Sequence, residues 1–324
     1  MTDFFAKFAS EKKNYTKNMA FSKKGNWKKS KQAGHLAAFI TVLCWGCSFI
    51  SSKILMDGAG MTPVEVFVYR FSIAYIFILA LTFRNLKSRC GKDELLFALC
   101  GICSGTLYFL MENYALIYTT TGNVSLLSSL SPIFIAILLA IIYKTRMSKG
   151  EVIGSAVAFA GVALVIFSEA ISKGLGLQIN PLGDFLALSC ALSWAIYSIA
   201  VKKLIPYYNT FFITRKLFFY GLVTAIPLLL IQPEPLHFGA LLDFSQPKYL
   251  MNLLFLALMC STTAYLLWNE SMKLIGPFAT NNYMYLQPPI TMIAGFLILG
   301  ETIYPFGYVG CALVLGGLLI ADKK

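Results

Sequence analysis

The sequence predicts an all-α integral membrane protein of ten transmembrane helices, arranged as two five-helix repeats of opposite topology. Three observations lead to this fold class. The 324 residues are 57% hydrophobic and only 13% charged, with a mean hydropathy of +0.69, whereas soluble chains carry about 25% charged residues. The apolar runs are long enough to cross a bilayer. One sequence pattern, moreover, occurs in both halves of the chain.

The predicted spans follow from the length of a membrane-crossing helix, which is about 20 residues. They cover residues 33–56, 62–83, 95–116, 121–143, 150–168, 182–204, 209–231, 249–270, 277–299 and 304–321. Most connections are only a few residues long, so neighbouring helices are expected to run antiparallel. The two repeats then comprise residues 33–168 and 182–321, joined by a linker at 169–181.

Basic residues in the loops support this count independently. Nine lysines lie in the segment 1–32, where only Asp3 and Glu11 oppose them. Along the rest of the chain, basic loops alternate with loops that have few bases, which by the positive-inside rule places both termini in the cytoplasm. Residues 1–32 are expected to be a disordered cytoplasmic tail near anionic lipid, neither a secretory signal nor a nucleic-acid-binding arm.

The repeated pattern runs from Leu43 to Lys53 and again from Leu192 to Lys202. Each copy places a Trp in an apolar run and a Lys eight residues later. Further residues correspond in the same order: Arg70 with Arg215, Tyr108 with Tyr265, Pro132 with Pro289, Gly154 with Gly310, and Gly161 with Gly317. Because five helices is an odd number, the second repeat must enter the membrane in the opposite sense. Inverted repeats of this kind are typical of secondary transporters.

Four stretches between Ala33 and Ala321 also occur in the order found in a known family. They are Trp45-Gly46-x-x-Phe49, Pro63 through Arg70-Phe71, Ala115-Leu116 to Ser131-Pro132, and Gly300-Glu301 followed by Gly310. This ordered set resembles the EamA-type family of the drug/metabolite transporter superfamily. The resemblance implies a ten-helix inverted-repeat carrier, commonly an exporter of amino acids or other small metabolites, and we expect it in the bacterial inner membrane. The first half has Tyr143-Lys144 in place of Gly300-Glu301, so any role of Glu301 is not duplicated.

Aromatic and polar side chains at mid-depth are the candidates for a substrate pathway. Trp45 and Trp194 are expected near the middle of their helices, where an indole needs a partner or a cavity. These tryptophans either line the pathway or pack between helices. The other candidates either line a cavity or link helices: Tyr108, Asn113, Tyr197, Tyr265, Asn269, Tyr283 and Gln287. Many such groups beside few buried charges predict a neutral, zwitterionic or amphipathic small-molecule substrate.

Two sets of charged residues are expected toward opposite ends of the pathway. Lys53, Arg70 and Glu112 lie toward the outside, and Lys202, Arg215 and Glu270 lie toward the inside. A charge at the centre of a span costs at least about 2.5–3.5 kcal/mol, so Arg70 must pair or line water. Each set forms a gate, a static ion pair or a substrate contact. Glu65, Glu112 and Glu270 are candidate proton relays if transport is proton-coupled.

Prolines and glycines are expected to shape the fourth, fifth, ninth and tenth helices. Pro132, Pro288 and Pro289 interrupt helical hydrogen bonding, and they are either hinges or fixed kinks. The glycines of the fifth and tenth helices permit close approach of backbones. These glycines either join the two halves or form a homodimer contact.

Sequence motifs of enzymes and of cofactor sites are absent. Cys44-x-x-Cys47 and Cys100-x-x-Cys103 have metal-ligand spacing, but both lie inside apolar spans without a His nearby, so packing is the expected role. No phosphate loop, HExxH motif or nucleophile elbow occurs, and no stretch is long enough for a nucleotide-binding domain. The sequence therefore predicts no metal, no cofactor and no enzyme, but a secondary transporter working by alternating access. The alternatives are efflux of cationic or amphipathic drugs and a non-transport membrane receptor.

Overall fold

The computed structural model describes residues 24–83, 87–118, 121–144, 147–174, 180–243, 245–300 and 302–322. Within these ranges it leaves out the side chains of residues 24–29, 49, 53, 113, 116, 117, 121–123, 125, 299 and 322. The described residues form helices and short connections without any strand. The predicted all-α class is therefore confirmed.

Helical segments follow one another along the first half with few connecting residues. They are α2 (Lys24–Lys53), η1 (Ile54–Gly58), α3 (Pro63–Thr82), α4 (Gly91–Gly101), η2 (Ile102–Thr106), α5 (Leu107–Tyr118), α6 (Thr121–Ser128), α7 (Ser131–Tyr143) and α8 (Lys149–Ile166). The end of the basic segment, expected to be disordered, is helical from Lys24 onward. The expected linker contains α9 (Ser168–Lys173), and residues 175–179 lie outside the described part.

The second half has a similar sequence of helical segments. They are α10 (Pro181–Leu204), α11 (Thr210–Ile231), η3 (Phe238–Leu241), α12 (Pro247–Leu254), η4 (Phe255–Thr263), α13 (Ala264–Ile275), α14 (Pro277–Asn282), η5 (Tyr283–Leu286), α15 (Gln287–Ala294), η6 (Gly295–Leu299) and α16 (Pro305–Asp322). Segments η1, η2, η4 and η6 are π-helical, and η3 and η5 are 3₁₀ turns.

Eight helices in the described part are long and apolar enough to cross a membrane. They coincide with the first eight predicted spans. The last two predicted spans coincide with the helical run 277–299, which contains a 3₁₀ turn, and with the shorter apolar helix Pro305–Ala321. The structure thus supports a helical membrane protein, and the count of ten spans stays a prediction.

Helix starts are specified by local sequence. Thr62 caps α3 by accepting from the Glu65 backbone, while the Glu65 carboxylate accepts from the Thr62 backbone, and Pro63 occupies the first helical position. Ser148 and Glu151 form the same capping box on α8. Each box satisfies backbone N–H groups that have no partner within the helix. These caps fix where the chain turns back into the bundle.

The fourth predicted helix of each half is interrupted at a proline. In the first half the chain leaves α6 and starts α7 with Pro132 in its first turn. In the second half α14 gives way to a 3₁₀ turn, and α15 starts with Pro288 and Pro289 in its first turn. Proline fits a first turn because its missing N–H has no helical acceptor there. The expected interruptions are thus present, and their movement stays a prediction.

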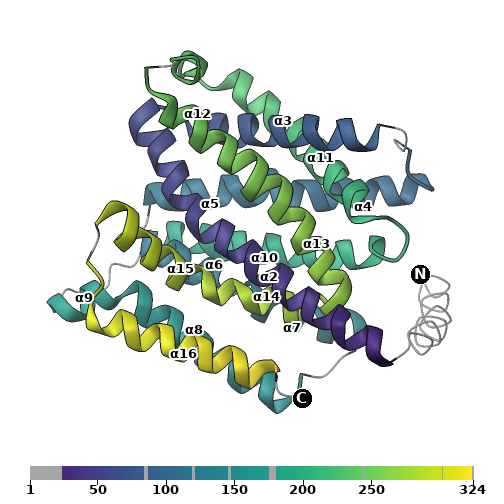
Figure 1. The fold of residues 1–324 in the computed structure, drawn as a ribbon, viewed down its shortest axis with the longest axis vertical. Coiled ribbons are helices and arrows are strands. Elements are labelled where there is room, and N and C mark those ends of the chain that lie inside the picture. The colour runs from purple at the N-terminus through teal and green to yellow at the C-terminus, as the bar shows by residue number, and fades with distance from the viewer. Residues whose placement is uncertain are drawn as a thin grey trace.

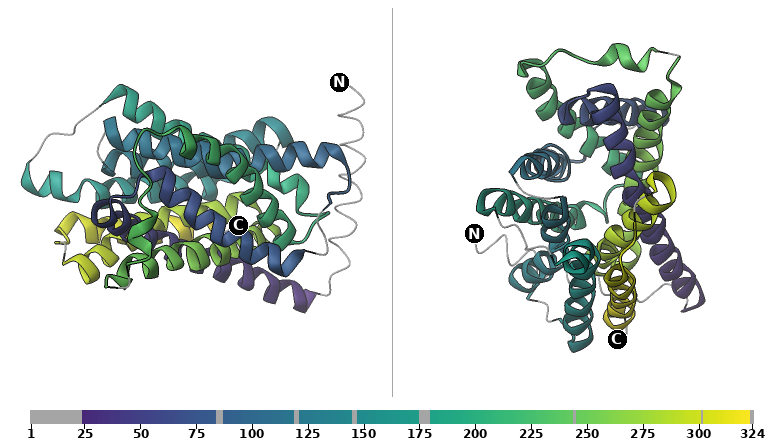
Figure 2. Two further views of the ribbon diagram at one scale, coloured as in Figure 1. Left: turned by 90° about the horizontal axis from the view of Figure 1, so that it is seen from above. Right: turned by 90° about the vertical axis from the view of Figure 1, so that its left-hand side faces the viewer.

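Contacts between the two halves form matching pairs. Helix α2 packs against α13 and α15, while α10 packs against α5, α6 and α7. Helices α3 and α11 contact each other toward one edge of the bundle, and α8 and α16 lie side by side at the opposite edge (Figures 1 and 2). Each contact therefore has a counterpart in which the halves are exchanged.

Glycines allow the close packing of α8 on α16. A Cβ atom placed on Gly154 would lie 2.4 Å from the Ala321 backbone nitrogen, and one on Gly317 would lie 2.4 Å from the Ala158 nitrogen. Gly161 and Gly310 meet in the same way, with the Cβ of each within 2.7 Å of the other's carbonyl oxygen. The two glycine faces are therefore used inside one chain, where they join the halves.

Candidate functional site

A cavity of about 120 Å³ lies between the two halves. Its lining comes from α2, η1, α3 and α5 of the first half and from α10, α13, η5 and α15 of the second. The lining residues are Trp45, Ser48, Ser52, Met56, Pro63, Val66, Phe67, Arg70, Tyr108, Phe109, Glu112, Trp194, Tyr265, Met284 and Gln287. Its lining extends from the paired tryptophans toward the loop that joins η1 to α3.

Helical periodicity explains most of this lining. Trp45, Ser48 and Ser52 are three and four residues apart and therefore share one face of α2. Pro63 and Arg70, seven residues apart, likewise share a face of α3. Ser48, Ser52, Met56 and Phe67 were not among the residues predicted for the site, although the first two follow Trp45 at helical spacing.

The two tryptophans meet in the wall of the cavity. The Trp45 and Trp194 ring centroids lie 5.4 Å apart with the rings edge to face, an arrangement that aromatic quadrupoles favour. The Trp45 Nε1 donates to the Cys260 carbonyl at 2.9 Å, and the Trp194 Nε1 donates to the Asn281 Oδ1 at 2.8 Å. Both indoles thus satisfy their N–H groups within the protein and keep ring surface toward the cavity.

Two π-helical segments supply carbonyl oxygens beside this site. Cys260 lies in η4, and Ser104, whose carbonyl accepts from the Tyr265 hydroxyl at 2.9 Å, lies in η2. The wider turn of a π-helix disturbs the regular carbonyl ladder, and such segments occur often at functional sites. The two segments precede Tyr265 and Tyr108, which correspond in the sequence repeat. Periodicity in the sequence predicts α-helix here and does not distinguish these π-helical segments.

Two charged side chains line the same cavity. Arg70 is 4% exposed, its Nε donates to the Ser261 hydroxyl at 2.9 Å, and its guanidinium lies 5.4 Å from the centroid of the Phe109 ring. Glu112 is 9% exposed and accepts from the Tyr108 hydroxyl at 3.3 Å. No ion pair joins Arg70 to Glu112 in the described residues. The side chain of Lys53, expected beside them, lies outside the described part.

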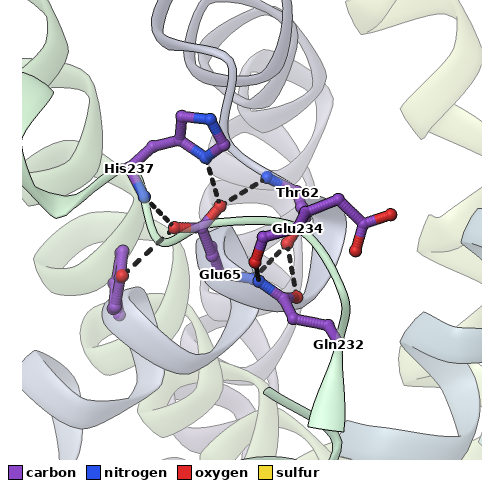
Figure 3. Close-up of polar contacts among 6 residues, drawn as sticks. Thr62, Glu65, Gln232, Glu234 and His237 are labelled. Carbon is purple, nitrogen blue, oxygen red and sulfur yellow. Dashed lines mark hydrogen bonds and ion pairs between the residues drawn. The ribbon is translucent and has the colours of Figure 1, made fainter. Parts of the chain in front are cut away.

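A polar cluster ties the 232–243 loop to the start of α3, next to the cavity residues Pro63 and Val66 (Figure 3). The buried Glu65 carboxylate accepts from the His237 backbone at 2.6 Å and lies 3.0 Å from the His237 Nδ1. It also accepts from the Thr62 backbone at 2.8 Å. Since a buried carboxylate requires several donors, Glu65 holds the loop in place rather than lining the cavity.

The charged residues expected toward the inside are not brought together. The Lys202 ammonium lies 4.2 Å from the centroid of the Tyr143 ring. Arg215 donates to the Thr82 carbonyl at 2.8 Å. Glu270 accepts from the Thr210 hydroxyl at 2.6 Å and pairs with Lys273 at 3.2 Å. In this arrangement each charge has its own neighbours instead of the other two.

Other predicted pathway residues with described side chains do not line the cavity. The Tyr197 hydroxyl donates to Asn269 at 2.8 Å, and Asn269 donates to the Thr214 hydroxyl at 3.2 Å, all three being buried. The Tyr283 hydroxyl is 3.0 Å from the His35 Nδ1. The side chain of Asn113 is among those left undescribed. Among the described residues, no three His, Cys, Asp or Glu side chains are placed to hold a metal ion.

The EamA-like transporter family model matches the chain twice, over residues 32–167 and 181–321. The chain belongs to this family. It is accordingly an integral membrane transporter and not an enzyme. A relative named uncharacterized transporter YyaM, from Bacillus subtilis (strain 168), is 30% identical over 296 residues, covering 89% of this chain and 94% of its own.

Other EamA-like relatives match over similar lengths. A probable terminal-alkyne amino-acid exporter from Streptantibioticus cattleyicolor is 24% identical over 289 residues, which cover 89% of this chain and 93% of the exporter. One solved crystal structure matches with a TM-score of 0.70 at 19% sequence identity, covering 90% of this chain and 96% of that one. The structural match supports the fold alone.

Proposed function

We propose that this EamA-like protein is a secondary transporter that exports amino acids or similar small zwitterionic metabolites by alternating access. The observation that carries the proposal is the cavity between the halves, in which aromatic rings surround one buried cation and one buried carboxylate. Such a lining provides both apolar contact and a few oriented polar groups, as small-molecule sites do. The predicted location is the bacterial cytoplasmic membrane, with both termini in the cytoplasm.

The cavity's size favours small metabolites over drugs. Its volume of about 120 Å³ is below the roughly 300–1,000 Å³ typical of sites for drug-sized ligands. An engineered cavity of about 150 Å³ takes up benzene, so a cavity of this size suits small solutes. The similarity to a probable amino-acid exporter supports the same class of substrate.

A ten-helix inverted repeat accounts for several paired features. The family model matches each half separately, and the contacts between the halves occur in exchanged pairs. The π-helical segments η2 and η4 and the prolines that begin α7 and α15 lie at corresponding positions. We infer that the halves rock against each other about the tryptophans, as inverted-repeat carriers do, with the proline interruptions as hinges.

Corresponding residues of the two halves differ in whether they face the cavity. Ser48 and Glu112 line the cavity, and their counterparts at the same spacing from the repeated Trp and Tyr are Tyr197 and Asn269. Those counterparts are hydrogen-bonded to each other. With the N-terminus in the cytoplasm, α2 ends at the outer face. We therefore assign this structure to an outward-facing state, with Tyr197, Asn269 and Thr214 closing the inner side.

Removing the Tyr197 hydroxyl is expected to favour the inward-facing state. A hydrogen bond contributes about 0.5–1.5 kcal/mol, so Tyr197→Phe should raise the inward-facing population up to about tenfold. The measurement is cytoplasmic labelling by a membrane-impermeant maleimide of Val201→Cys, at the position that corresponds in the repeat to the cavity residue Ser52, with the native cysteines replaced by alanine. The control is Tyr285→Phe, because Tyr285 is equally buried but takes no part in the Tyr197–Asn269–Thr214 hydrogen bonds. Equal labelling of both variants and the parent would count against this closure.

The carrier proposal is tested by counterflow in proteoliposomes. Vesicles that contain the purified protein and unlabelled amino acid inside should accumulate the labelled amino acid transiently and saturably. Protein-free vesicles provide the control. Folded protein that moves no amino acid above this background would contradict the proposed substrate class, and folded protein that also moves no sugar or organic cation would contradict the carrier itself.

A further inference from the structure

We propose that Arg70 and Glu112 form a two-point site for a zwitterion, with Arg70 binding the substrate carboxylate and Glu112 binding its ammonium group. The site would select α-amino acids over amines and carboxylic acids, which offer only one of the two charges. This inference rests on the proposed carrier function and adds the groups that recognise the substrate.

Arg70 has donors to spare at the cavity. A guanidinium carries five N–H donors, and within the described part of the chain Arg70 uses only Nε, which donates to Ser261. Its guanidinium lies over the Phe71 and Phe109 rings at 5.6 and 5.4 Å, and these rings offer no oxygen acceptor. The remaining N–H groups of this buried cation match the two oxygens of a carboxylate, which arginine binds in a bidentate manner.

Glu112 has acceptor capacity to spare in the same cavity. A carboxylate accepts about four hydrogen bonds, whereas the structure gives Glu112 one long bond, from the Tyr108 hydroxyl to Oε1. Its charge can be balanced by an ammonium group, which supplies three donors. Burial makes an unbalanced carboxylate costly, so a cationic ligand group is its natural partner.

The separation of the two charges is what suits a zwitterion. Opposite charges that serve only to join helices are expected to form a direct ion pair, but no such pair joins Arg70 to Glu112 in the described ranges. Both residues instead border one cavity. A ligand with a carboxylate and an ammonium group balances both charges at once, and its side chain then lies among the rings of Trp45 and Trp194.

The charged pair is specific to the first half. In the second half, Asn269 stands where Glu112 stands in the first, and it is bonded to Tyr197. The counterpart of Arg70 is Arg215, which donates to Thr82 and does not line the cavity. The repeated scaffold therefore does not require an arginine and a glutamate facing the pathway, which favours a role in recognition.

Competition experiments test the two-point site. In proteoliposomes, uptake of labelled L-alanine, L-valine and L-leucine is measured first, and the best of the three is challenged with its own single-charge analogues. For valine these are isobutylamine, which lacks the carboxylate, and isovalerate, which lacks the amine. Each analogue should compete at least about tenfold more weakly than the amino acid, because one charged hydrogen-bonding contact is lost.

Variants assign each charge to its residue. Arg70→Gln should weaken competition by valine and isovalerate about ten- to a hundredfold and leave competition by isobutylamine unchanged. Glu112→Gln should weaken competition by valine and isobutylamine and spare isovalerate. Arg70→Lys, which keeps the positive charge, should retain part of the competition by valine and isovalerate that Arg70→Gln loses. The control Arg215→Gln should preserve the ratios between the inhibition constants of the three competitors. These ratios do not depend on the amount of folded protein.

Several outcomes would overturn the inference. Equal competition by valine and isobutylamine would exclude recognition of the carboxylate, and a uniform loss for all three competitors in both variants would indicate a structural role. If the wild-type protein carries other solutes but no amino acid or other zwitterion, the two-point site and the proposed substrate class are wrong, and only transport by alternating access stands. If it carries no solute at all, both proposals fail.

Discussion

Gly317→Ala is expected to destabilise the protein, whereas the same change at the neighbouring Gly316 is not. A methyl group on Gly317 would lie 2.4 Å from the backbone nitrogen of Ala158 and 2.6 Å from the Gly154 carbonyl oxygen. Backbone atoms in a packed helix cannot move aside, so α16 must separate from α8. Overpacking of this kind costs about 1–3 kcal/mol of the free energy of unfolding, and Gly317→Leu should cost more.

Gly316 provides the matched control on the same helix. Nothing lies within 4 Å of a methyl group placed there, and replacing a helical glycine by alanine stabilises by about 0.5–1 kcal/mol. The measurement is the apparent melting temperature of the detergent-solubilised protein at one fixed scan rate, since such unfolding is often irreversible. Equal melting temperatures for the two variants would mean that α8 and α16 are not held by this contact.

Trp45→Ala and Trp194→Ala are each expected to lower saturable flux by at least about tenfold. Each change removes a side chain that lines the cavity and a hydrogen bond, accepted by the Cys260 carbonyl in one case and by the Asn281 side chain in the other. Losing a buried tryptophan also costs about 3–5 kcal/mol of folding stability, so flux has to be compared between equal amounts of folded protein. The measurement is the initial rate of amino-acid uptake per molecule of folded protein.

Trp268→Phe serves as the control for this loss. Trp268 packs 4.9 Å from Trp45, centroid to centroid, but does not line the cavity, and its Nε1 has no hydrogen-bond partner in the described residues. Flux should therefore survive this change. If flux also survives both alanine variants, the two cavity tryptophans serve only to pack the helices.

The sequence predicted the helical membrane fold well because lipid imposes simple constraints on length and polarity. Apolar runs of sufficient length predicted eight helices that meet the requirements of a span. The ninth predicted span contains a 3₁₀ turn, at which Pro288 and Pro289 begin a new helix. The capping boxes at Thr62 and Ser148 precede α3 and α8, and each of these helices begins within one residue of its predicted start.

The site was only partly predictable, because sequence alone does not say which polar groups meet one another. Trp45, Tyr108 and Gln287 were expected near a pathway, and they line the cavity. Tyr197 and Asn269 are polar and were expected at a similar depth, yet they are hydrogen-bonded to each other instead of lining the cavity. Whether two such groups bond together or face a cavity depends on how the helices are tilted, and that information is spread over the whole fold.

The tryptophan cluster also gives the protein a built-in optical probe. Three of its four tryptophans, Trp45, Trp194 and Trp268, lie with ring centroids 4.9–6.0 Å apart, while Trp27 is about 27 Å away along α2. Indoles at such spacing exchange excitation energy, so a solute that enters the cavity beside Trp45 and Trp194 should change the fluorescence of all three. Intrinsic fluorescence can therefore follow occupancy of the cavity in the unlabelled wild-type protein.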